Sequence, residues 1–373
     1  MIQKKASAFN FYLLIILFIL IISITGCKKN TSSAKDNSAK ITVIDDVGRT
    51  VGFEKPLSRV VVFNKMNAEI IRALGKVSTI VGIDANIAQD KDYWHELDLN
   101  AIAGQKQTAL NYEAIVNLNP EAVILPKNGS YEEAIEKLTP FGISVLVVTG
   151  WENVKFVKQV EIMAKAYNVE AQGKEYINFC RAPLDIIKER LKDIPESERQ
   201  TIYFENNGEY KTCLAGSGWN DMLTSSGGQN LFGEIIFKKE DSSKGSVHSF
   251  QVDPEEIIDR NPDIILQNVY STKAHSGTSI YIQMADDEMK DTLSELVKRP
   301  GWNTLKAVKN NHVYGISSFA GNACFKIVGS LYLAKWMYPD LFKDIKPDEF
   351  FAEWLEKYQQ VEPLKNGYVY HLQ

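Results

Sequence analysis

Polar and aromatic residues recur directly after the apolar runs of this sequence, and their chemistry suits the binding of a small organic molecule. Asn64 and Lys65 follow the apolar run at 59–63, and Trp151 follows the run at 142–149. Aromatic rings would supply contact area, and lysines or amides would hold the polar edges of the molecule. The complete set of candidate ligand-binding residues is Asn64, Lys65, Lys127, Asn128, Trp151, Asn207, Tyr210, Trp219, Tyr270, Phe319 and Phe325.

Each of these side chains also has a plainer interpretation. For Trp151 and Trp219 the alternative is packing within their own lobes, and for Lys65 and Lys127 it is solvation at the surface. Parallel strands bring their carboxyl ends to one edge of a sheet, where small-molecule sites form. We therefore expect the candidates to gather where two such edges face each other.

The histidines argue against a bare metal ion. Such a site needs His and carboxylate side chains that converge on one point, and the five histidines show no close spacing. We interpret His312 as a surface residue. His275, near the loop after Tyr270, is the best single candidate for direct or axial coordination. The sequence therefore predicts no resident cofactor and no directly bound metal.

The sequence gives little indication of an enzyme. It has no GxSxG elbow, no GxGxxG after a strand and no Walker loop. The GSG at 216–218 and the GG at 227–228 are too short for a phosphate cradle. We expect the protein not to be an enzyme. A surface-anchored hydrolase with paired carboxylates stays open as an alternative of another class, as does an adhesin or scaffold.

Length and composition limit the class of protein. With 373 residues, of which 45% are hydrophobic and 24% charged, the chain is too apolar for disorder and too long for one compact core. A formal charge of −5 argues against nucleic-acid binding. Apart from Cys27, we expect Cys180, Cys213 and Cys324 to be buried thiols with at most one disulfide among them.

The beginning of the chain reads as a targeting segment. Lys4 and Lys5 precede an apolar run at 11–22, which is long enough for a signal-peptide core and too short for a membrane span. The small residues before Cys27 resemble a lipobox, so we expect a signal peptide at 1–26 and a lipidated flexible tether at 27–40. The alternative is an uncleaved anchor with an incidental cysteine. Either interpretation places the protein outside the cytoplasm on a membrane.

Two segments of the sequence repeat each other at an offset of 142 residues. Glu113 matches Glu255, and the Asn-Pro pair at 119–120 matches the pair at 261–262. Each segment reads as a short amphipathic helix that stops before the proline, followed by a fully buried strand. The repeat predicts two α/β lobes with similar cores.

The remaining pattern predicts how these lobes are joined. Apolar runs at 59–63, 142–149, 201–205 and 312–316 alternate with helical patterns, which is typical of parallel sheets. We expect an N-terminal α/β lobe at 41–152, a helical connector at 153–198, and a C-terminal α/β lobe with C-terminal helices at 199–373. The connector should contain a long helix at 171–194, which Pro183 should kink or split.

Several segments together resemble one protein family. They are the opening TVIDDVGRTVGFEKPLSRVVVFNKMNAEIIRALG, the paired NYEAIVNLNPEAVIL and DPEEIIDRNPDIIL, the segment CLAGSGWNDMLTSSGGQNLF, and the closing RPGWNTLKAVKNNHVYGI and YLAKWMYPDLF. In this order, and behind a lipobox, they resemble the substrate-binding proteins of ABC importers. The resemblance covers about residues 41–345, and it is to the helical-backbone group that binds iron–siderophore complexes, haem and vitamin B12.

The resemblance implies a fold and a set of partners. The fold would be two Rossmann-like lobes with parallel sheets, joined by a long α-helical connector. Glu113 and Glu255 match the glutamates that dock onto arginines of the membrane permease in this family. Their alternative role is that of solvated carboxylates on a helix face. The partners would be the permease and its ATPase subunits, which hydrolyse the ATP, and we expect a monomer that binds no nucleic acid.

The resemblance also implies a function. The protein would be an extracytoplasmic, lipid-anchored binding protein that captures an iron(III)–siderophore complex or a related metal chelate. Binding of a corrinoid (vitamin B12) or haem by the same mechanism is the alternative. The polar, irregular segment at 270–289 should form a loop at the edge of the cleft that sets specificity.

Overall fold

The computed structural model describes residues 41–274 and 279–373, and every structural statement here concerns these residues. The expected signal peptide at 1–26, the tether at 27–40 with Cys27, and His275 lie outside them. None of the helices in the two described ranges is long and apolar enough to cross a membrane.

The first lobe is built on a six-stranded sheet with the order β6-β5-β4-β3-β7-β8. All neighbouring pairs are parallel except β5 and β6. The strands are β3 (Val60–Val62), β4 (Ile80–Asp84), β5 (Ile102–Lys106), β6 (Ala109–Leu110), β7 (Ala122–Leu125) and β8 (Ser144–Val147), and the helices are α2 (Lys65–Ala73), α3 (Tyr112–Asn117) and α4 (Tyr131–Leu138). A hairpin of β1 (Ile41–Ile44) and β2 (Thr50–Phe53) precedes the sheet.

The second lobe is built on a five-stranded sheet with the order β11-β9-β14-β15-β16. Its strands are β9 (Thr201–Glu205), β11 (Gln229–Asn230), β14 (Ile264–Val269), β15 (Val313–Ser317) and β16 (Val369–Leu372). Only β16 runs antiparallel. A small antiparallel sheet contains β10 (Lys211–Thr212), β12 (Gly245–Ser246) and β13 (Ser249–Gln251). The edge strand β16 was not expected from the sequence.

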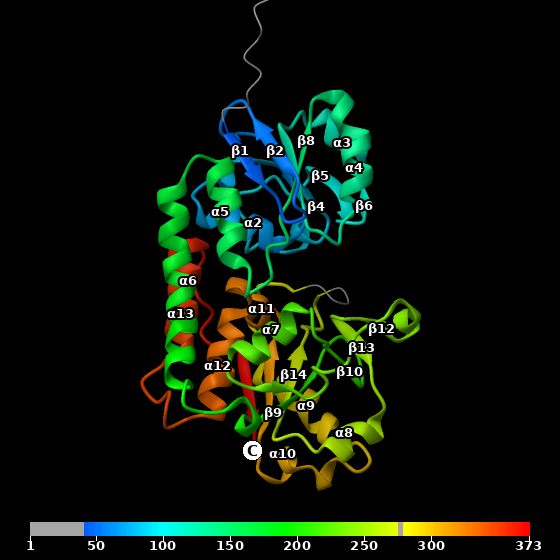
Figure 1. Cartoon of the computed structure of the whole chain (residues 1–373), viewed down its shortest axis with the longest axis vertical. Helices are drawn as coiled ribbons and strands as arrows, with labels where there is room; N and C mark the ends of the chain where they lie inside the picture. The colour runs from blue at the N-terminus through cyan, green and yellow to red at the C-terminus, as the bar shows by residue number, and fades with distance from the viewer. Residues whose placement is uncertain (1–40, 275–278) are drawn as a thin grey trace, which may run out of the picture. The chain divides into compact units, whose positions relative to one another are not determined.

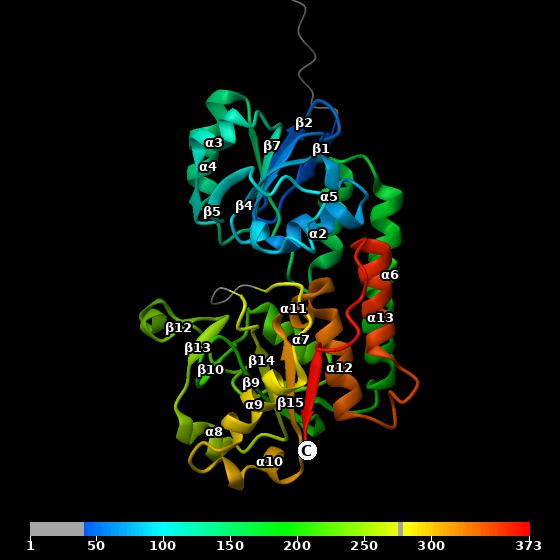
Figure 2. The same cartoon turned by 180° about the vertical axis from the view of Figure 1, so that it is seen from behind.

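Seven helices of the second lobe surround its sheets in the described residues. They are α7 (Gly218–Ser225), α8 (Pro254–Arg260), α9 (Asp286–Val297), α10 (Lys306–Lys309), α11 (Ser318–Asn322), α12 (Ile327–Met337) and α13 (Pro347–Glu353). The two sheets with their helices confirm the predicted two-lobed α/β fold (Figures 1 and 2).

Two helices connect the lobes, α5 (Phe156–Ala166) and α6 (Glu170–Arg190). They pack closely at Gly173, where a Cβ atom would lie 2.5 Å from the Cβ of Ala164. Helix α6 also packs against α12 of the second lobe (Figure 1). Of the two expected effects of Pro183, a kink or a split, the split does not occur, because α6 is one helix of 21 residues that runs through the proline. The helix also ends four residues earlier than the apolar pattern suggested.

The two repeated segments form equivalent units in the two lobes. The side chains of Asn111 and Asp253 accept hydrogen bonds from backbone N–H groups in the first turns of α3 and α8. Each helix is followed by an asparagine with positive φ, 47° at Asn119 and 48° at Asn261, directly before the proline. The strands that follow, β7 and β14, lie inside their sheets and are largely buried. The predicted repeat is therefore confirmed.

The hydrophobic core is continuous from the lobes into the connector. Phe325 of the second lobe packs against Phe156 of α5 and Tyr176 of α6, with ring centroids 5.4 and 6.0 Å apart. As predicted, Cys180, Cys213 and Cys324 are buried free thiols. This packing fixes the position of the connector against the second lobe.

Candidate functional site

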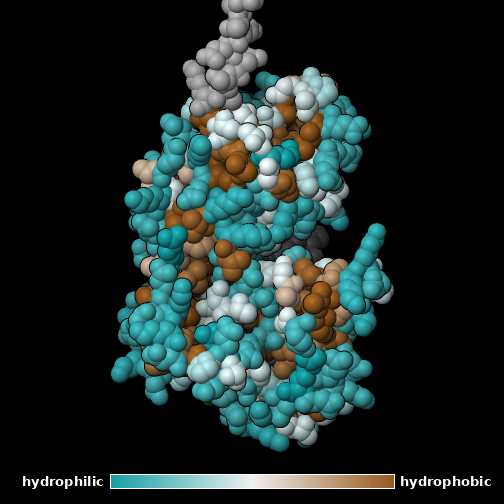
Figure 3. Space-filling model, viewed as in Figure 1, coloured by the Kyte–Doolittle hydropathy of each residue, from teal (hydrophilic) through white to brown (hydrophobic). Residues whose placement is uncertain are grey.

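A cavity of about 410 Å³ is lined by residues of both lobes. It lies at the carboxyl ends of β3 and β4, as expected for a ligand site on parallel sheets. Figure 3 shows mainly hydrophilic residues on the first-lobe side of the hollow between the lobes, and a mixture of neutral and hydrophobic residues on the second-lobe side. The lining residues are Asn64, Lys65, Met66, Asp84, Asn86, Lys106, Gln107, Trp151, Trp219, Tyr270, Ser279 and Asn322.

Asp84 organises the first-lobe side of this cavity. Its buried carboxylate accepts hydrogen bonds from the backbone N–H groups of Asn64 at 2.7 Å, Asn86 at 2.9 Å and Ile87 at 3.0 Å. Burial raises the pKa of the Asp84 carboxyl, and the three N–H donors limit that rise. The side chain therefore joins the loops after β3 and β4, and its main role is to position them.

Lys65 is the buried cation of the cavity. Its Nζ atom lies 3.2 Å from Oγ and 3.3 Å from the carbonyl oxygen of Ser279, which belongs to the second lobe. The ammonium also lies 4.2 Å from the ring centroid of Phe319 and 3.7 Å from Glu69. Burial lowers the pKa of Lys65, whereas the Glu69 carboxylate raises it. A ligand with an acceptor atom would thus compete with Ser279 for this lysine.

The segment around Ser279 bridges the two lobes at the edge of the cavity. The backbone N–H of Tyr281 donates to Oδ2 of Asp90 at 2.7 Å, and the Tyr281 ring lies 5.5 Å from that of Tyr93. Residues 279–285 form neither helix nor strand, as predicted for a loop at the cleft edge, but residues 286–289 of the predicted loop begin helix α9. The predicted effect of this loop on specificity stays a prediction.

Aromatic side chains contribute the second-lobe side of the cavity. Trp219 packs on Phe204 with ring centroids 5.0 Å apart and leaves only 6% of its surface exposed. The hydroxyl of Tyr270 donates to Oδ1 of Asn206, which also accepts from the Asn268 amide at 2.8 Å. These contacts hold the two rings in fixed positions before any ligand arrives.

Five of the eleven predicted ligand-binding residues line the cavity together, namely Asn64, Lys65, Trp151, Trp219 and Tyr270. Phe319 lies directly behind Lys65. Lys127 forms an ion pair with Glu152 at 2.5 Å, and Asn128 and Asn207 are exposed outside the cavity.

Tyr210 and Phe325 occupy places other than the predicted one. The guanidinium carbon of Arg299 lies 4.5 Å from the centroid of the Tyr210 ring. Tyr210 also donates its backbone N–H to Glu205, so it belongs to the ionic network around that buried carboxylate. Phe325 is buried in the core between α5 and α6. Neither side chain lines the cavity. The sequence did not reveal whether such an aromatic side chain faces the cavity or the core.

Sequence reasoning missed seven lining residues, Met66, Asp84, Asn86, Lys106, Gln107, Ser279 and Asn322. Four of them follow or end β4 and β5, two strands that were not predicted. The sequences IVGID and IAGQK carried a usable signal of these strands and their site residues, since in each one apolar residues are followed by polar or charged residues.

The histidines in the described residues show no metal centre. His248 is held by Ser217, with Nδ1 3.0 Å from Oγ, and burial lowers its pKa. His312 is partly buried and contacts the carbonyl oxygen of Asp263. Within residues 41–274 and 279–373, no group of three or more His, Cys, Asp or Glu is arranged to hold a metal ion.

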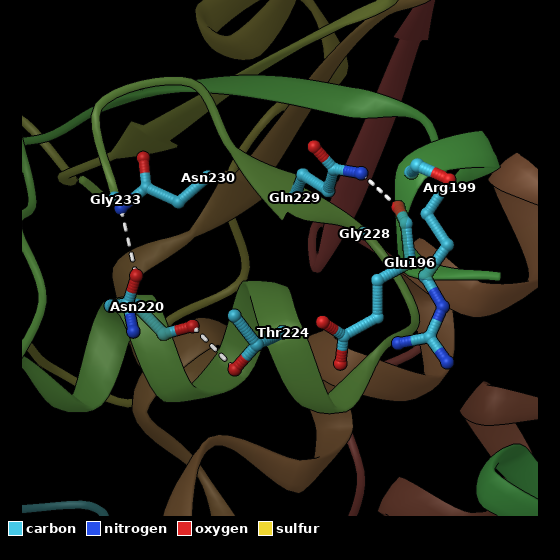
Figure 4. A pocket seen from close by; sticks show the side chains of 9 residues that line it. Glu196, Arg199, Asn220, Thr224, Gly228, Gln229, Asn230 and Gly233 are labelled. Carbon is cyan, nitrogen blue, oxygen red and sulfur yellow. Dashed lines mark hydrogen bonds between the residues drawn. The ribbon is translucent and has the colours of Figure 1, made fainter.

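A second pocket of about 400 Å³ is lined by residues of the second lobe and by Glu196 and Ser197 at the end of the connector segment (Figure 4). It is lined by polar side chains around α7 and β11, including Arg199, Asn220 and Thr224. Gln229 donates to the carbonyl oxygen of Glu196 across its rim. It contains none of the predicted ligand-binding residues, no aromatic ring and no contribution from the first lobe. The cavity between the lobes is therefore the better candidate site.

Glu113 and Glu255 occupy matching places in the two lobes. Each is exposed and lies in the first turn of its helix, Glu113 in α3 and Glu255 in α8. Both views show α3 and α8 on the side of the body away from α6 (Figures 1 and 2). The pair is accessible to a partner.

Comparisons with known proteins agree with the two-lobed fold. The chain is 23% identical to the uncharacterized ABC transporter substrate-binding lipoprotein YvrC of Bacillus subtilis, over 88% of this chain and 97% of that protein. It is 22% identical to the molybdate-binding protein MolA of Haemophilus influenzae, over 85% and 90%. The crystal structure of the TroA-like periplasmic binding protein FepB from Veillonella parvula superposes with a TM-score of 0.70 at 24% identity, over 89% of this chain and 100% of that one.

The family model described as periplasmic binding protein matches residues 60–319, which include the first-lobe sheet, the second-lobe sheet except β16, and the cavity lining except Asn322. With this match, the two α/β lobes and the connector of α5 and α6, the chain belongs to the periplasmic binding protein family.

Proposed function

We propose that this protein is the extracytoplasmic substrate-binding lipoprotein of an ABC importer, and that it captures an iron(III)–siderophore complex or related metal chelate. The observation that carries the proposal is the cavity, where Trp151, Trp219 and Tyr270 meet a buried lysine and several amides. A metal chelate presents flat organic surface and polar oxygen edges, and this lining offers a partner for both.

The size and rigidity of the cavity support a small-molecule ligand. A volume of about 410 Å³ lies at the lower end of the range of roughly 300–1,000 Å³ typical of ligand pockets. The wall residues are held before binding by hydrogen bonds that they donate to the side chains of Asp84 and Asn206. A preformed site loses less conformational freedom when it binds.

Corrinoid or haem binding by the same mechanism is the alternative within the family. A relative named as a molybdate-binding protein adds a free oxyanion to the ligands worth testing. Membership of a family of binding proteins argues against a surface-anchored hydrolase. The relative named as a lipoprotein supports attachment of this chain through Cys27.

Delivery would involve the exposed pair Glu113 and Glu255. One carboxylate on each lobe allows a permease to contact both lobes at once, which orients the complex more than it strengthens it, since an exposed ion pair contributes only about 0.2–1 kcal/mol. We propose arginines of the permease as the partners and the associated ATPase as the source of energy.

A ligand panel with tryptophan fluorescence tests the proposed site. The purified full-length protein is titrated with ferric tris-catecholate, ferric tris-hydroxamate, haem, cyanocobalamin and molybdate. We expect one metal chelate to quench the fluorescence, and a ligand at 100 times its Kd to stabilise the protein by about 2.7 kcal/mol.

Single replacements assign the quenching to the cavity. Trp151→Phe and Trp219→Phe should each remove a large part of the signal, whereas the control Trp336→Phe, on α12 outside the cavity lining, should not. A chelate that binds without changing the fluorescence of Trp151 or Trp219 would show that the site lies elsewhere.

A further inference from the structure

Lys326 is a buried cation directly behind the wall of the cavity. Its side chain is 3% exposed, its Nζ donates to Oδ1 of Asn322 at 2.7 Å, and it lies 4.3 Å from the ring centroid of Trp219. Both Asn322 and Trp219 line the cavity, whereas Lys326 does not reach it. The ammonium is thus separated from the ligand space by the thickness of one side chain.

The ammonium of Lys326 has no carboxylate partner within 4 Å in the described part of the chain. The charged and titratable groups that face it from the elements packed around it are Lys65 and Glu69 of α2, Asp221 of α7, Cys213, and His248 before β13. Lys65 opposes its charge, Glu69 is already paired with Lys65 at 3.7 Å, and Asp221 attracts it without forming an ion pair. A charged Lys326 is therefore buried without a direct anionic partner, which is unfavourable.

The backbone that places Lys326 is strained. Cys324, Phe325 and Lys326 have positive φ values of 47°, 56° and 67° in succession. Residues with a Cβ atom rarely adopt this conformation, and it persists where the surrounding packing imposes it, often at functional sites. Here it turns the lysine inward toward Trp219 at the start of α12, instead of toward solvent.

We propose that the ligand is an anionic, oxygen-rich molecule, and that Lys326 supplies its counter-charge through the wall formed by Asn322 and Trp219. This inference rests on the proposed function and names the charge class of its ligand. Lys65 contacts the ligand directly, whereas Lys326 determines which charge the cavity accepts. An anionic chelate with catecholate or carboxylate oxygens and a free oxyanion share this chemistry.

A proton should be taken up when such a ligand binds. Burial lowers the pKa of Lys326 to about 7, so at about pH 8 most molecules carry the neutral amine in the free protein. A nearby anion favours the charged form and raises the pKa, which makes the amine bind a proton. At about pH 6 the amine is already charged, and uptake should be small.

Calorimetry on the purified full-length protein tests this inference. Ferric tris-catecholate and ferric tris-hydroxamate have similar bulk, but the first is trianionic and the second is neutral. Molybdate represents the free oxyanion. Titrations at about pH 8 in two buffers of different ionisation enthalpy report the protons taken up. We expect an anionic probe to bind at least about tenfold more tightly than the neutral complex, with uptake of a proton.

Replacements at position 326 separate charge from shape. Lys326→Met keeps the length of the side chain and should weaken the anionic probe at least about tenfold, abolish proton uptake and spare the neutral complex. Lys326→Arg should keep the preference for the anion and take up no proton, because a guanidinium is always charged. The control Lys309→Met, at an exposed lysine of α10, should behave as the wild type.

The outcomes distinguish this inference from the proposed function. Tighter binding of the neutral complex, or equal loss of both probes in Lys326→Met, would overturn the role of Lys326 while leaving the proposed function intact. If molybdate binds and neither chelate does, the inferred anionic class of ligand would be supported, and the proposal of a metal chelate as the ligand would be overturned. If Lys326→Met does not fold, the Lys326→Arg result decides, since persistent proton uptake there contradicts the inference.

Discussion

Replacing Arg299 by methionine should lower the free energy of unfolding by about 3–5 kcal/mol. The guanidinium donates to both oxygens of Glu205, at 2.7 and 2.9 Å, and Glu205 is almost fully buried. The same carboxylate accepts from the hydroxyl of Tyr203 and the backbone N–H of Tyr210, both at 2.8 Å. Without Arg299, the buried carboxyl group of Glu205 is left with only neutral hydrogen-bond donors. Urea unfolding measures the change.

Two further variants control this measurement. Lys298→Met removes the neighbouring exposed lysine and its ion pair with Glu295, and it should leave stability nearly unchanged. Adding Glu205→Gln to Arg299→Met should restore part of the loss, because the uncompensated charge is then gone. A loss of less than about 1 kcal/mol for Arg299→Met alone would contradict the proposed network.

Reversing the charge of both exposed glutamates should abolish transport while leaving ligand affinity unchanged. Glu113→Lys with Glu255→Lys would set two cations against the arginines that we propose on the permease, and like charges oppose docking. Neither residue lines the cavity, so binding of the ligand should persist. Import of radioactive iron as the chelate found in the panel, and stimulation of the ATPase in vesicles, measure the effect.

A matched pair of surface variants keeps the same change in net charge. Glu136→Lys with Glu353→Lys alters exposed glutamates on α4 and α13, and transport should continue. Equal loss of transport in both double variants would mean that net charge, and not docking at α3 and α8, limits delivery.

The sequence revealed the architecture because the architecture depends on local patterns. The repeat at 111–125 and 253–266 places a capped helix, an asparagine before proline and a buried strand in each lobe, and each of these follows from near neighbours. The alternation of such units predicts parallel sheets. Strand β16 escaped prediction because its place at the sheet edge depends on pairing with β15, which lies far away in sequence.

The candidate site was predictable only in part, because position after a strand does not determine where a side chain points. Asn64, Lys65 and Trp151 follow strands and reach the cavity. Phe325 is separated from β15 by helix α11, and its ring packs into the core against α5 and α6. Lys326 looked like any lysine near a helix start, and only the packing around Trp219 shows it to be buried.

The location of a bound chelate tests the central claim most directly. Crystals of the protein grown with the ferric complex that binds in the panel are measured at the iron absorption edge, where iron gives an anomalous signal. The account predicts a single strong peak inside the cavity, between Trp151, Trp219 and Lys65. A peak in the second-lobe pocket beside Arg199, or elsewhere on the surface, would contradict it.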